Sequence, residues 1–261
     1  MERNDRWDDI WSAKQRFASG RLKSALIRDV IYRTVDLILR REIPEPRGKR
    51  VLEVGSGSGL VSLALARRGA DVTLCDISPE AIKFSKAVFA RAGVKETTVE
   101  GSIFGLPFET DTFDATWNAG VIEHFEKEDQ TRALREMLRV TRPGGRVVVA
   151  VPSSRAGIYA RAKRYADRKG LWQPGYEAPI ASFRDIAAQV PATLTHEYSI
   201  GFLAQLHFLK YYFPKPAWLR LAWCGLVEVL SLVLRPLNRL PGYLLVAVFE
   251  KEPRQPATPT Q

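Results

Sequence analysis

Cysteine and long apolar runs are scarce in this 261-residue chain, and each scarcity excludes a class of protein. Two cysteines, Cys75 and Cys224, are too few for a zinc ligand set or a disulfide framework, which suits a reducing compartment. No apolar run reaches the roughly 20 residues that a membrane-spanning helix needs. Residues 1–9 are mostly charged, which argues against a signal peptide. We therefore expect a cytoplasmic protein.

The charge of the chain is positive and unevenly distributed. An apolar content of 46% and a charged content of 26% are ordinary for a soluble globular protein, and the net charge is +10. Residues 1–50 carry +5, residues 51–150 carry −2, and residues 151–261 carry +7. The flanking segments could therefore attract an anionic substrate, a nucleic acid or an anionic membrane.

A short apolar run that meets three glycines is the most informative stretch. Arg50–Leu60 reads Arg-Val-Leu-Glu-Val-Gly-Ser-Gly-Ser-Gly-Leu, and an alanine-rich helical pattern follows it. Because glycine accepts positive φ and has no Cβ, a ligand can lie against such a loop while helix N–H groups point at it. Nicotinamide and flavin proteins use G-x-G-x-x-G, whose third glycine here falls on Leu60 or Ser62. That fingerprint is absent.

Strands and helices alternate after the loop. Apolar runs predict strands over residues 71–75, 97–100, 112–117 and 146–151, with helices between them. Such alternation is typical of a parallel sheet with helices on both faces, whose ligands bind at the carboxyl ends of the strands. Two further strands are expected at 196–202 and 243–250, and an amphipathic helix at 21–41 precedes the loop.

Four motifs resemble those of the class I S-adenosylmethionine-dependent methyltransferases, in the small-molecule group similar to methyltransferase-11. They are Glu53 with the three glycines, Asp76 at the tip of the second strand, the segment Asn118–His124, and the turn Arg142-Pro143-Gly144-Gly145. Many relatives have Gly-Asp before a Leu-Pro-Phe, whereas this chain has Gly101-Ser102, which weakens the implied adenine contact.

The resemblance implies S-adenosyl-L-methionine as cofactor, S-adenosyl-L-homocysteine as product, and no metal. Asp76 would accept hydrogen bonds from both ribose hydroxyls, although it also precedes a helix start with Ser78 as cap and Pro79 at the first position. N-terminal helices commonly close over the cofactor in this family, which makes Trp11 a candidate contact. The implied contacts are Glu53, Gly55, Ser56, Gly57, Gly59, Asp76, Ile77, Ser102, Ile103, Asn118, Ala119 and Trp11.

The expected fold class is α/β, a Rossmann-like doubly wound seven-stranded sheet, mostly parallel with the last strand antiparallel. N-terminal helices over residues 1–47 would cover the cofactor site, and residues 48–250 would form the methyltransferase domain. Within that domain, 153–180 is expected as a cap segment and 203–241 as a helical insertion before the last strand. Residues 251–261, which are rich in proline, predict a disordered tail.

Methyl transfer needs an acceptor lone pair held in line and, for some acceptors, a base. His124 is the first candidate base, because imidazole titrates near neutral pH and this residue follows the fourth strand, and His207 is the second. Glu123 and His124 could equally serve only to hold the loop that shapes the cofactor pocket. Both roles stay open for this pair.

The insertion contains a mostly apolar helix over residues 217–234. Its polar residues form one narrow stripe: Arg220, Cys224, Glu228, Ser231 and Arg235. The segment is too short to span a bilayer. Three interpretations stay open: packing in the core, a lid or homodimer surface, or peripheral membrane contact through residues 206–240 beside basic side chains.

The sequence predicts an S-adenosylmethionine-dependent methyltransferase that acts on an oxygen or nitrogen of a small, hydrophobic or lipid-like molecule by in-line displacement. Two alternatives remain, an RNA methyltransferase and a non-catalytic cofactor-binding subunit. Neither an Asn-Pro-Pro-Tyr nor an Asp-Pro-Pro-Tyr motif follows the fourth strand, and no RNA-binding module is recognisable, so we expect no nucleic-acid partner.

Overall fold

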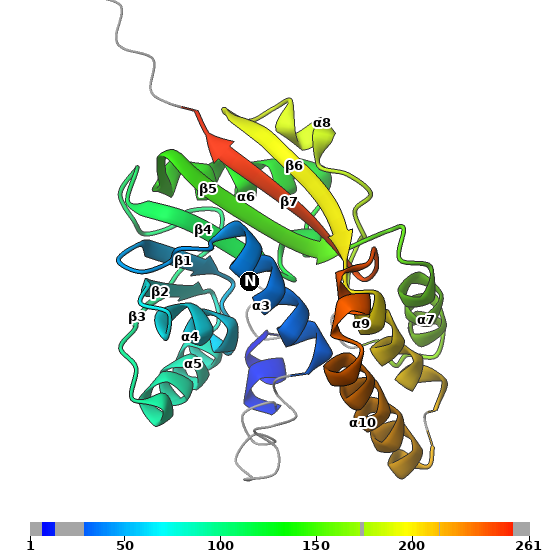
Figure 1. Cartoon of the computed structure of the whole chain (residues 1–261). Coiled ribbons are helices and arrows are strands. Elements are labelled where there is room, and N and C mark those ends of the chain that lie inside the picture. The colour runs from blue at the N-terminus through cyan, green and yellow to red at the C-terminus, as the bar shows by residue number, and fades with distance from the viewer. Residues whose placement is uncertain (1–6, 14–28, 173–174, 214, 253–261) are drawn as a thin grey trace, which may run out of the picture.

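A seven-stranded sheet organises the chain in the computed structural model, which describes residues 7–13, 29–172, 175–213 and 215–252. The strand order is β3-β2-β1-β4-β5-β7-β6 (Figure 1). The strands are β1 (Arg50–Val54), β2 (Asp71–Asp76), β3 (Thr97–Glu100), β4 (Phe113–Ala119), β5 (Thr141–Pro152), β6 (Ala192–Ile200) and β7 (Leu244–Lys251).

The strand directions place one set of ends along one edge. Strands β1 to β5 pair in parallel, while β7 runs antiparallel to both of its neighbours, β5 and β6. Crossovers between parallel strands pass through helices, so the carboxyl ends of β1, β2 and β4 meet at the same edge. The Rossmann-like doubly wound fold with an antiparallel last strand is therefore confirmed.

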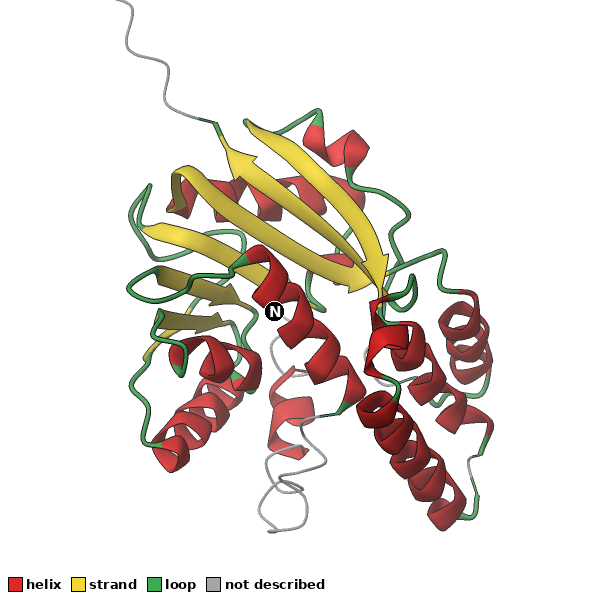
Figure 2. Ribbon diagram, in the orientation of Figure 1, coloured by secondary structure: helices red, strands yellow, loops and turns green. Residues whose placement is uncertain are grey.

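Helices cover both faces of the sheet (Figure 2). Successive strand residues point to opposite faces, so Val51 packs in a core with α3 (Val30–Glu42), α4 (Leu60–Ala66) and α5 (Pro79–Ala92). Its neighbour Leu52 packs in the opposite core, with α6 (Lys127–Val140) and α8 (Arg184–Ala187). Both cores are built from the same buried strands, which read as nearly continuous apolar runs.

A third group of helices lies where β5 and β6 end (Figure 1). It contains α7 (Gly157–Arg168), α9 (Phe202–Leu206), η2 (His207–Tyr212), α10 (Ala217–Val233) and η3 (Arg235–Arg239). Tyr159 of α7 packs edge-on against Phe208 and Tyr243, with ring centroids 4.8 and 5.0 Å apart. The cap segment and the insertion predicted from the sequence thus share one small aromatic core.

Several element boundaries differ from those predicted. The helix expected over 21–41 begins at Val30, because Asp29 caps it by accepting hydrogen bonds from the backbone N–H groups of Ile31 and Tyr32. Residues 14–28 lie outside the described part of the chain. The expected sixth strand ends at Ile200, because Gly201 adopts a positive φ of 92° and starts α9.

The fifth strand is longer than expected, and the last strand is shifted by one residue toward the C-terminus. Strand β5 begins at Thr141, and the Pro-Gly-Gly sequence forms an irregularity within it, marked by a register shift against β4. Lys251, expected in the tail, is the last residue of β7, and its ammonium donates to Asp111 at 2.6 Å. Residues 253–261 lie outside the described chain.

Candidate active site

The glycine loop joins β1 to α4 at the edge where the parallel strands end. Its first two amides, those of Gly55 and Ser56, donate to the carbonyl oxygen of Cys75 at 2.8 and 3.1 Å. Gly57 has a φ of 50°, and Gly59 has a φ of 63° in a place where a Cβ would lie 2.8 Å from the side chain of Leu74. The loop therefore needs glycine for its backbone conformation and for its close packing on β2.

Asp76 lies at the end of β2, directly beneath the loop. Its carboxylate accepts from the N–H of Gly57 at 2.8 Å and from the N–H of Ser78 at 2.9 Å. Burial raises the pKa of this carboxyl, and the nearby carboxylate of Asp8 adds to the rise. The structural alternative is also present, since Ser78 caps α5 through the N–H of Ala81 and Pro79 is its first residue. Asp76 is thus placed for both roles.

Three predicted contact residues have buried polar atoms without a hydrogen-bond partner among the described residues. These atoms are Glu53 Oε2, Ser56 Oγ and Asn118 Oδ1. Burial, followed by the charge of Asp76, raises the pKa of Glu53 well above its usual value. An unpaired buried polar group costs about 1–3 kcal/mol, which a polar ligand at the strand ends would offset. The residues present therefore fit a polar cofactor such as S-adenosylmethionine.

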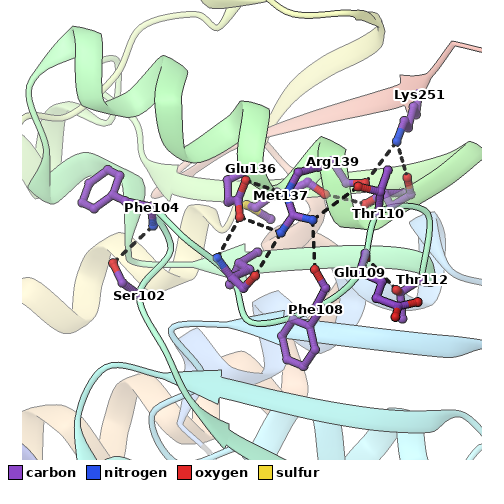
Figure 3. Close-up of polar contacts among 12 residues, drawn as sticks. Ser102, Phe104, Phe108, Glu109, Thr110, Thr112, Glu136, Met137, Arg139 and Lys251 are labelled. Carbon is purple, nitrogen blue, oxygen red and sulfur yellow. Dashed lines mark hydrogen bonds and ion pairs between the residues drawn. The ribbon is translucent and has the colours of Figure 1, made fainter.

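The loop that follows β3 carries Ser102 and Ile103. The hydroxyl of Ser102 accepts from the N–H of Phe104 at 3.2 Å, so it stabilises its own turn (Figure 3). Ile103 is buried in the core beside α6. Further along, the guanidinium of Arg139 donates to the carbonyl oxygens of Leu106 and Phe108, both at 2.9 Å. These contacts hold the loop against α6.

Arg139→Lys is expected to lower the free energy of unfolding by about 2 kcal/mol, because a lysine cannot reproduce the planar fork that joins two carbonyls and Glu136. Urea denaturation measures the loss. Arg132→Lys, on the same helix and exposed, is the matched control and should change stability by less than about 0.5 kcal/mol. Equal stabilities of the two variants would contradict this anchoring role.

Residues 7–13 are helical and cover the glycine loop. The indole of Trp11 lies so close to Gly57 that a Cβ there would be 2.2 Å from its ring, and the ring also contacts Phe84. Asp8 accepts a hydrogen bond from the Ser78 hydroxyl, which fixes the helix at residues 7–13 to the start of α5. The sequence pointed to Trp11 but not to Asp8, because a lone acid among many charges carries no signal of a distant partner.

His124 is the last residue of η1 (Ile122–His124), which follows the end of β4. Its Nδ1 forms a hydrogen bond of 2.7 Å with the carbonyl oxygen of Tyr176, and Trp7 meets the imidazole edge-on at 5.1 Å. The helix at residues 7–13, the cap segment and the candidate base His124 therefore meet at one point. A histidine whose Nδ1 is held by a carbonyl presents Nε2 as its proton acceptor.

Glu123, named with His124 in the sequence, has an acidic neighbour, Glu177, that the sequence did not point to. Glu123 is almost fully buried, and burial together with the charge of Glu177 raises its pKa well above the usual value. Burial also raises the pKa of Glu177, which accepts a hydrogen bond from the Tyr159 hydroxyl. Two neighbouring acids that resist ionisation can hold a proton and donate it to a hydroxyl or carbonyl oxygen. Only the folded cap segment brings them together.

His207 belongs to the aromatic core rather than to the strand ends. Its Nε2 accepts from the ammonium of Lys210 at 2.8 Å, and burial followed by the charge of Lys210 lowers its pKa to about 3. A base with so low a pKa takes a proton from an acceptor poorly at neutral pH. The geometry thus favours His124, and it leaves His207 as a neutral packing residue.

The remaining predicted contacts divide between the loop and its surroundings. Ala119 and Asn118 end β4 next to the glycine loop, and Ile77 lies 36% exposed beyond Asp76. A cavity of about 440 Å³ opens farther away, beside α10, and is lined by Lys210, Arg220 and Cys224 among others. The predicted cofactor residues are gathered at one edge of the sheet, and only His207 lies apart from them.

The central part of the chain matches a known family and several known proteins. Residues 52–149 match the family described as "Methyltransferase domain". Over 119 residues the chain is 34% identical to "Ubiquinone biosynthesis O-methyltransferase" of Xanthomonas axonopodis pv. citri, covering 45% of this chain and 49% of that protein. It is 41% identical over 101 residues to "2-methyl-6-phytyl-1,4-hydroquinone methyltransferase 2, chloroplastic" of Oryza sativa subsp. japonica, covering 38% and 28%. The chain thus spans about half or less of these relatives.

Solved structures share the fold over most of the chain. Magnesium protoporphyrin IX methyltransferase from Synechocystis PCC 6803, solved with bound SAH, superposes with a TM-score of 0.64 at 13% identity and covers 95% of this chain and 98% of that one. A putative methyltransferase in complex with the Haloferax volcanii Trm112 activator gives a TM-score of 0.63 at 20% identity, covering 93% and 98%. At these identities the likeness concerns the fold alone.

Proposed function

We propose that this chain, whose residues 52–149 form a class I S-adenosylmethionine-dependent methyltransferase domain, methylates an oxygen or nitrogen of a small hydrophobic molecule. The observation that carries the cofactor assignment is the set of unpaired buried atoms on Glu53, Ser56 and Asn118 around a glycine loop fixed by Asp76. Bound there, S-adenosylmethionine would supply an electrophilic methyl group on its sulfonium sulfur.

The residues of the chain would bind the cofactor and shield it from water. Asp76 offers carboxylate lone pairs that remain after its two amide contacts, which suits the ribose hydroxyls. Asn118, at the end of β4, faces the same edge and has a free amide oxygen for a cationic or polar group. The helix at residues 7–13, which contains Trp11, would exclude water from the glycine loop.

His124 would receive the proton that the acceptor loses. It lies half-buried between the helix at residues 7–13 and the cap segment, so an acceptor that enters there would meet the imidazole near the glycine loop. Glu123, whose pKa is raised well above its usual value by burial, would orient a second oxygen of the acceptor, with Glu177 beside it. These roles favour a hydroxylated aromatic acceptor, and the two curated relatives carry names that refer to ubiquinone and to a hydroquinone.

Transfer of a labelled methyl group tests the proposal. Purified protein is incubated with methyl-labelled S-adenosylmethionine and, separately, a hydrophobic hydroquinone in detergent, bulk RNA, or buffer, and the extracts are counted and analysed by mass spectrometry. We expect label in the organic extract only. Label in RNA would favour the nucleic-acid alternative, and cofactor binding without transfer to either acceptor would favour a non-catalytic subunit.

His124→Asn is expected to lower kcat by about 100-fold, with a smaller effect on KM, because a positioned base contributes at least that factor. The pH dependence of kcat should lose its acidic limb, which a purely structural role would leave in place. His196→Asn is the matched control, since His196 lies on β6 and contacts Glu42 away from the strand ends. Equal kcat values for the wild type and His124→Asn would remove His124 from catalysis.

A further inference from the structure

Helix α10 turns an apolar face to solvent, while Glu228 and Ser231 of its polar stripe face the protein. Val233 and Trp218 are 72% and 66% exposed, the largest exposures among the large apolar residues that the structure describes. At 3.6 residues per turn, the exposed apolar positions of α10 fall on one side of the helix. The exposed members of this face are Trp218, Leu221, Leu226, Val229, Leu232 and Val233.

The orientation of α10 is fixed by partly buried polar contacts. Glu228 accepts from the backbone N–H of Val30 at 3.0 Å and forms an ion pair with Arg33. Ser231 accepts from the guanidinium of Arg33 at 2.5 Å, and the indole N–H of Trp223 donates to the carbonyl oxygen of Leu206 at 2.8 Å. Rotating α10 to hide its apolar face would break these contacts, so packing in the core, one of the sequence-based interpretations, is not what the structure shows.

The apolar surface continues beyond α10. Leu234, Leu237 and Leu240 are each at least 37% exposed, in η3 and the residues on either side of it. We call the exposed apolar side chains of 218–240 the apolar face. Soluble monomers seldom expose a continuous apolar surface of this kind, and such surfaces usually mark an interaction with protein or membrane.

The charges beside the apolar face indicate which kind of partner binds there. Lys215, Arg220, Arg235 and Arg239 are exposed at the two ends of the face. The single acid of residues 203–241, Glu228, is used internally. Two copies joined through this face would gather these cations without acidic partners, whereas an anionic lipid surface would neutralise them while their long stems cover apolar area.

We propose that α10 and η3 form an interfacial anchor that seats the chain on the surface of an anionic lipid bilayer. No helix of the described residues is long and apolar enough to cross a membrane. An interfacial helix instead lies in the plane of the headgroups, with its apolar residues in the acyl boundary and its cations among the headgroups. Helix α10 has both features, an exposed apolar face and exposed cations at its two ends.

The anchor lies at the end of the molecule where the cap helices gather. Figure 1 shows α10 and α7 in the helical group beyond the ends of β5 and β6. Helix α10 also contacts α3, through Glu228 and Arg33. A chain seated on this face would therefore hold its cap segment close to the bilayer. This placement goes beyond the proposed function, because it concerns attachment of the chain and would hold for any acceptor.

Cosedimentation of the full chain with vesicles tests the anchor, in the absence of cofactor and acceptor. One set of vesicles contains phosphatidylcholine and phosphatidylglycerol, the other phosphatidylcholine alone. We expect binding to the anionic set, weakened roughly tenfold or more by Leu226→Glu with Val229→Glu. Arg235→Gln with Arg239→Gln should weaken binding to the anionic set by roughly tenfold and lower its salt dependence.

Ala188→Glu with Thr193→Glu is the matched control, because it adds the same charge at exposed positions just after α8 and on β6 and should bind as the wild type does. Circular dichroism checks folding, which exposed substitutions should preserve. The proposal is overturned if the wild type ignores anionic vesicles or if Leu226→Glu with Val229→Glu binds them unchanged. A dimer that this variant dissociates, without vesicle binding, would assign the face to a second copy. None of these results bears on methyl transfer.

Discussion

Asp76→Ala is expected to weaken the binding of S-adenosylmethionine about thirtyfold, or about 2 kcal/mol, the scale of hydrogen bonds to a charged group. Two losses act together. The N–H of Gly57 loses its acceptor at 2.8 Å, and the ligand loses a buried carboxylate placed at the end of β2. Isothermal titration calorimetry measures the change.

Two further variants separate these losses from a general loss of stability. Asp71→Ala lies at the exposed start of the same strand and should bind the cofactor as the wild type does. Asp76→Asn retains one oxygen for an amide of the loop, so an intermediate affinity is expected. Unchanged affinity in Asp76→Ala would remove this acid from the site, whatever its contribution to the start of α5.

A second large effect is a pH-dependent loss of stability caused by His207. Its pKa is about 3 in the folded protein and about 6.5 when unfolded, because burial and the ammonium of Lys210 disfavour imidazolium. Between these values the unfolded chain binds more protons than the folded one, so stability falls as pH falls below 6.5. At pH 5 this loss should reach about 2 kcal/mol, from about 1.4 kcal/mol per pH step.

The measurement compares urea denaturation of the wild type and His207→Asn at pH 7.5 and pH 5. Glu53 and Glu123, whose pKa values are raised by burial, act with the opposite sign, so the readout is the difference between the two proteins. We expect His207→Asn to lose about 2 kcal/mol less than the wild type on acidification. Parallel losses in both proteins would show that His207 is accessible to protons in the folded state.

The sheet could be predicted because its signals are local. Three glycines after Val54, the acid at the tip of the 71–76 run, and Ser78-Pro79 at a helix start each depend on a few adjacent residues. Strand β3 has the predicted bounds. Errors fall where one residue outside the apolar pattern decides, as at Gly201, whose positive φ ends β6 early.

The site could be predicted only in part, because part of it depends on distant contacts. The glycine loop and Asp76 come from one strand-loop-helix unit and its neighbour. Glu123 and Glu177, whose pKa values are raised by burial, come together when the cap segment folds across η1. There the N–H of Ala178 donates to the carbonyl oxygen of Glu123. No spacing in the sequence encodes that approach.

Helix α10 shows a different limit. The polar stripe through Glu228 was visible in the sequence, but its direction was not, because a stripe can face water in a core helix or face the protein in an interfacial one. Arg33, about 195 residues away in the sequence, decides the question by pairing with Glu228. Tertiary contact therefore determines which face of α10 is exposed.

The central claim is that the glycine loop and the acids around it bind S-adenosylmethionine. Calorimetric titration of the purified chain with S-adenosylhomocysteine, which has the same adenosine and amino-acid groups, tests it most directly. We expect one site per chain, with affinity lost in Asp76→Ala and retained in Asp71→Ala, and no binding of NADH. A folded protein that releases no heat with S-adenosylhomocysteine, or that binds NADH in its place, would contradict it.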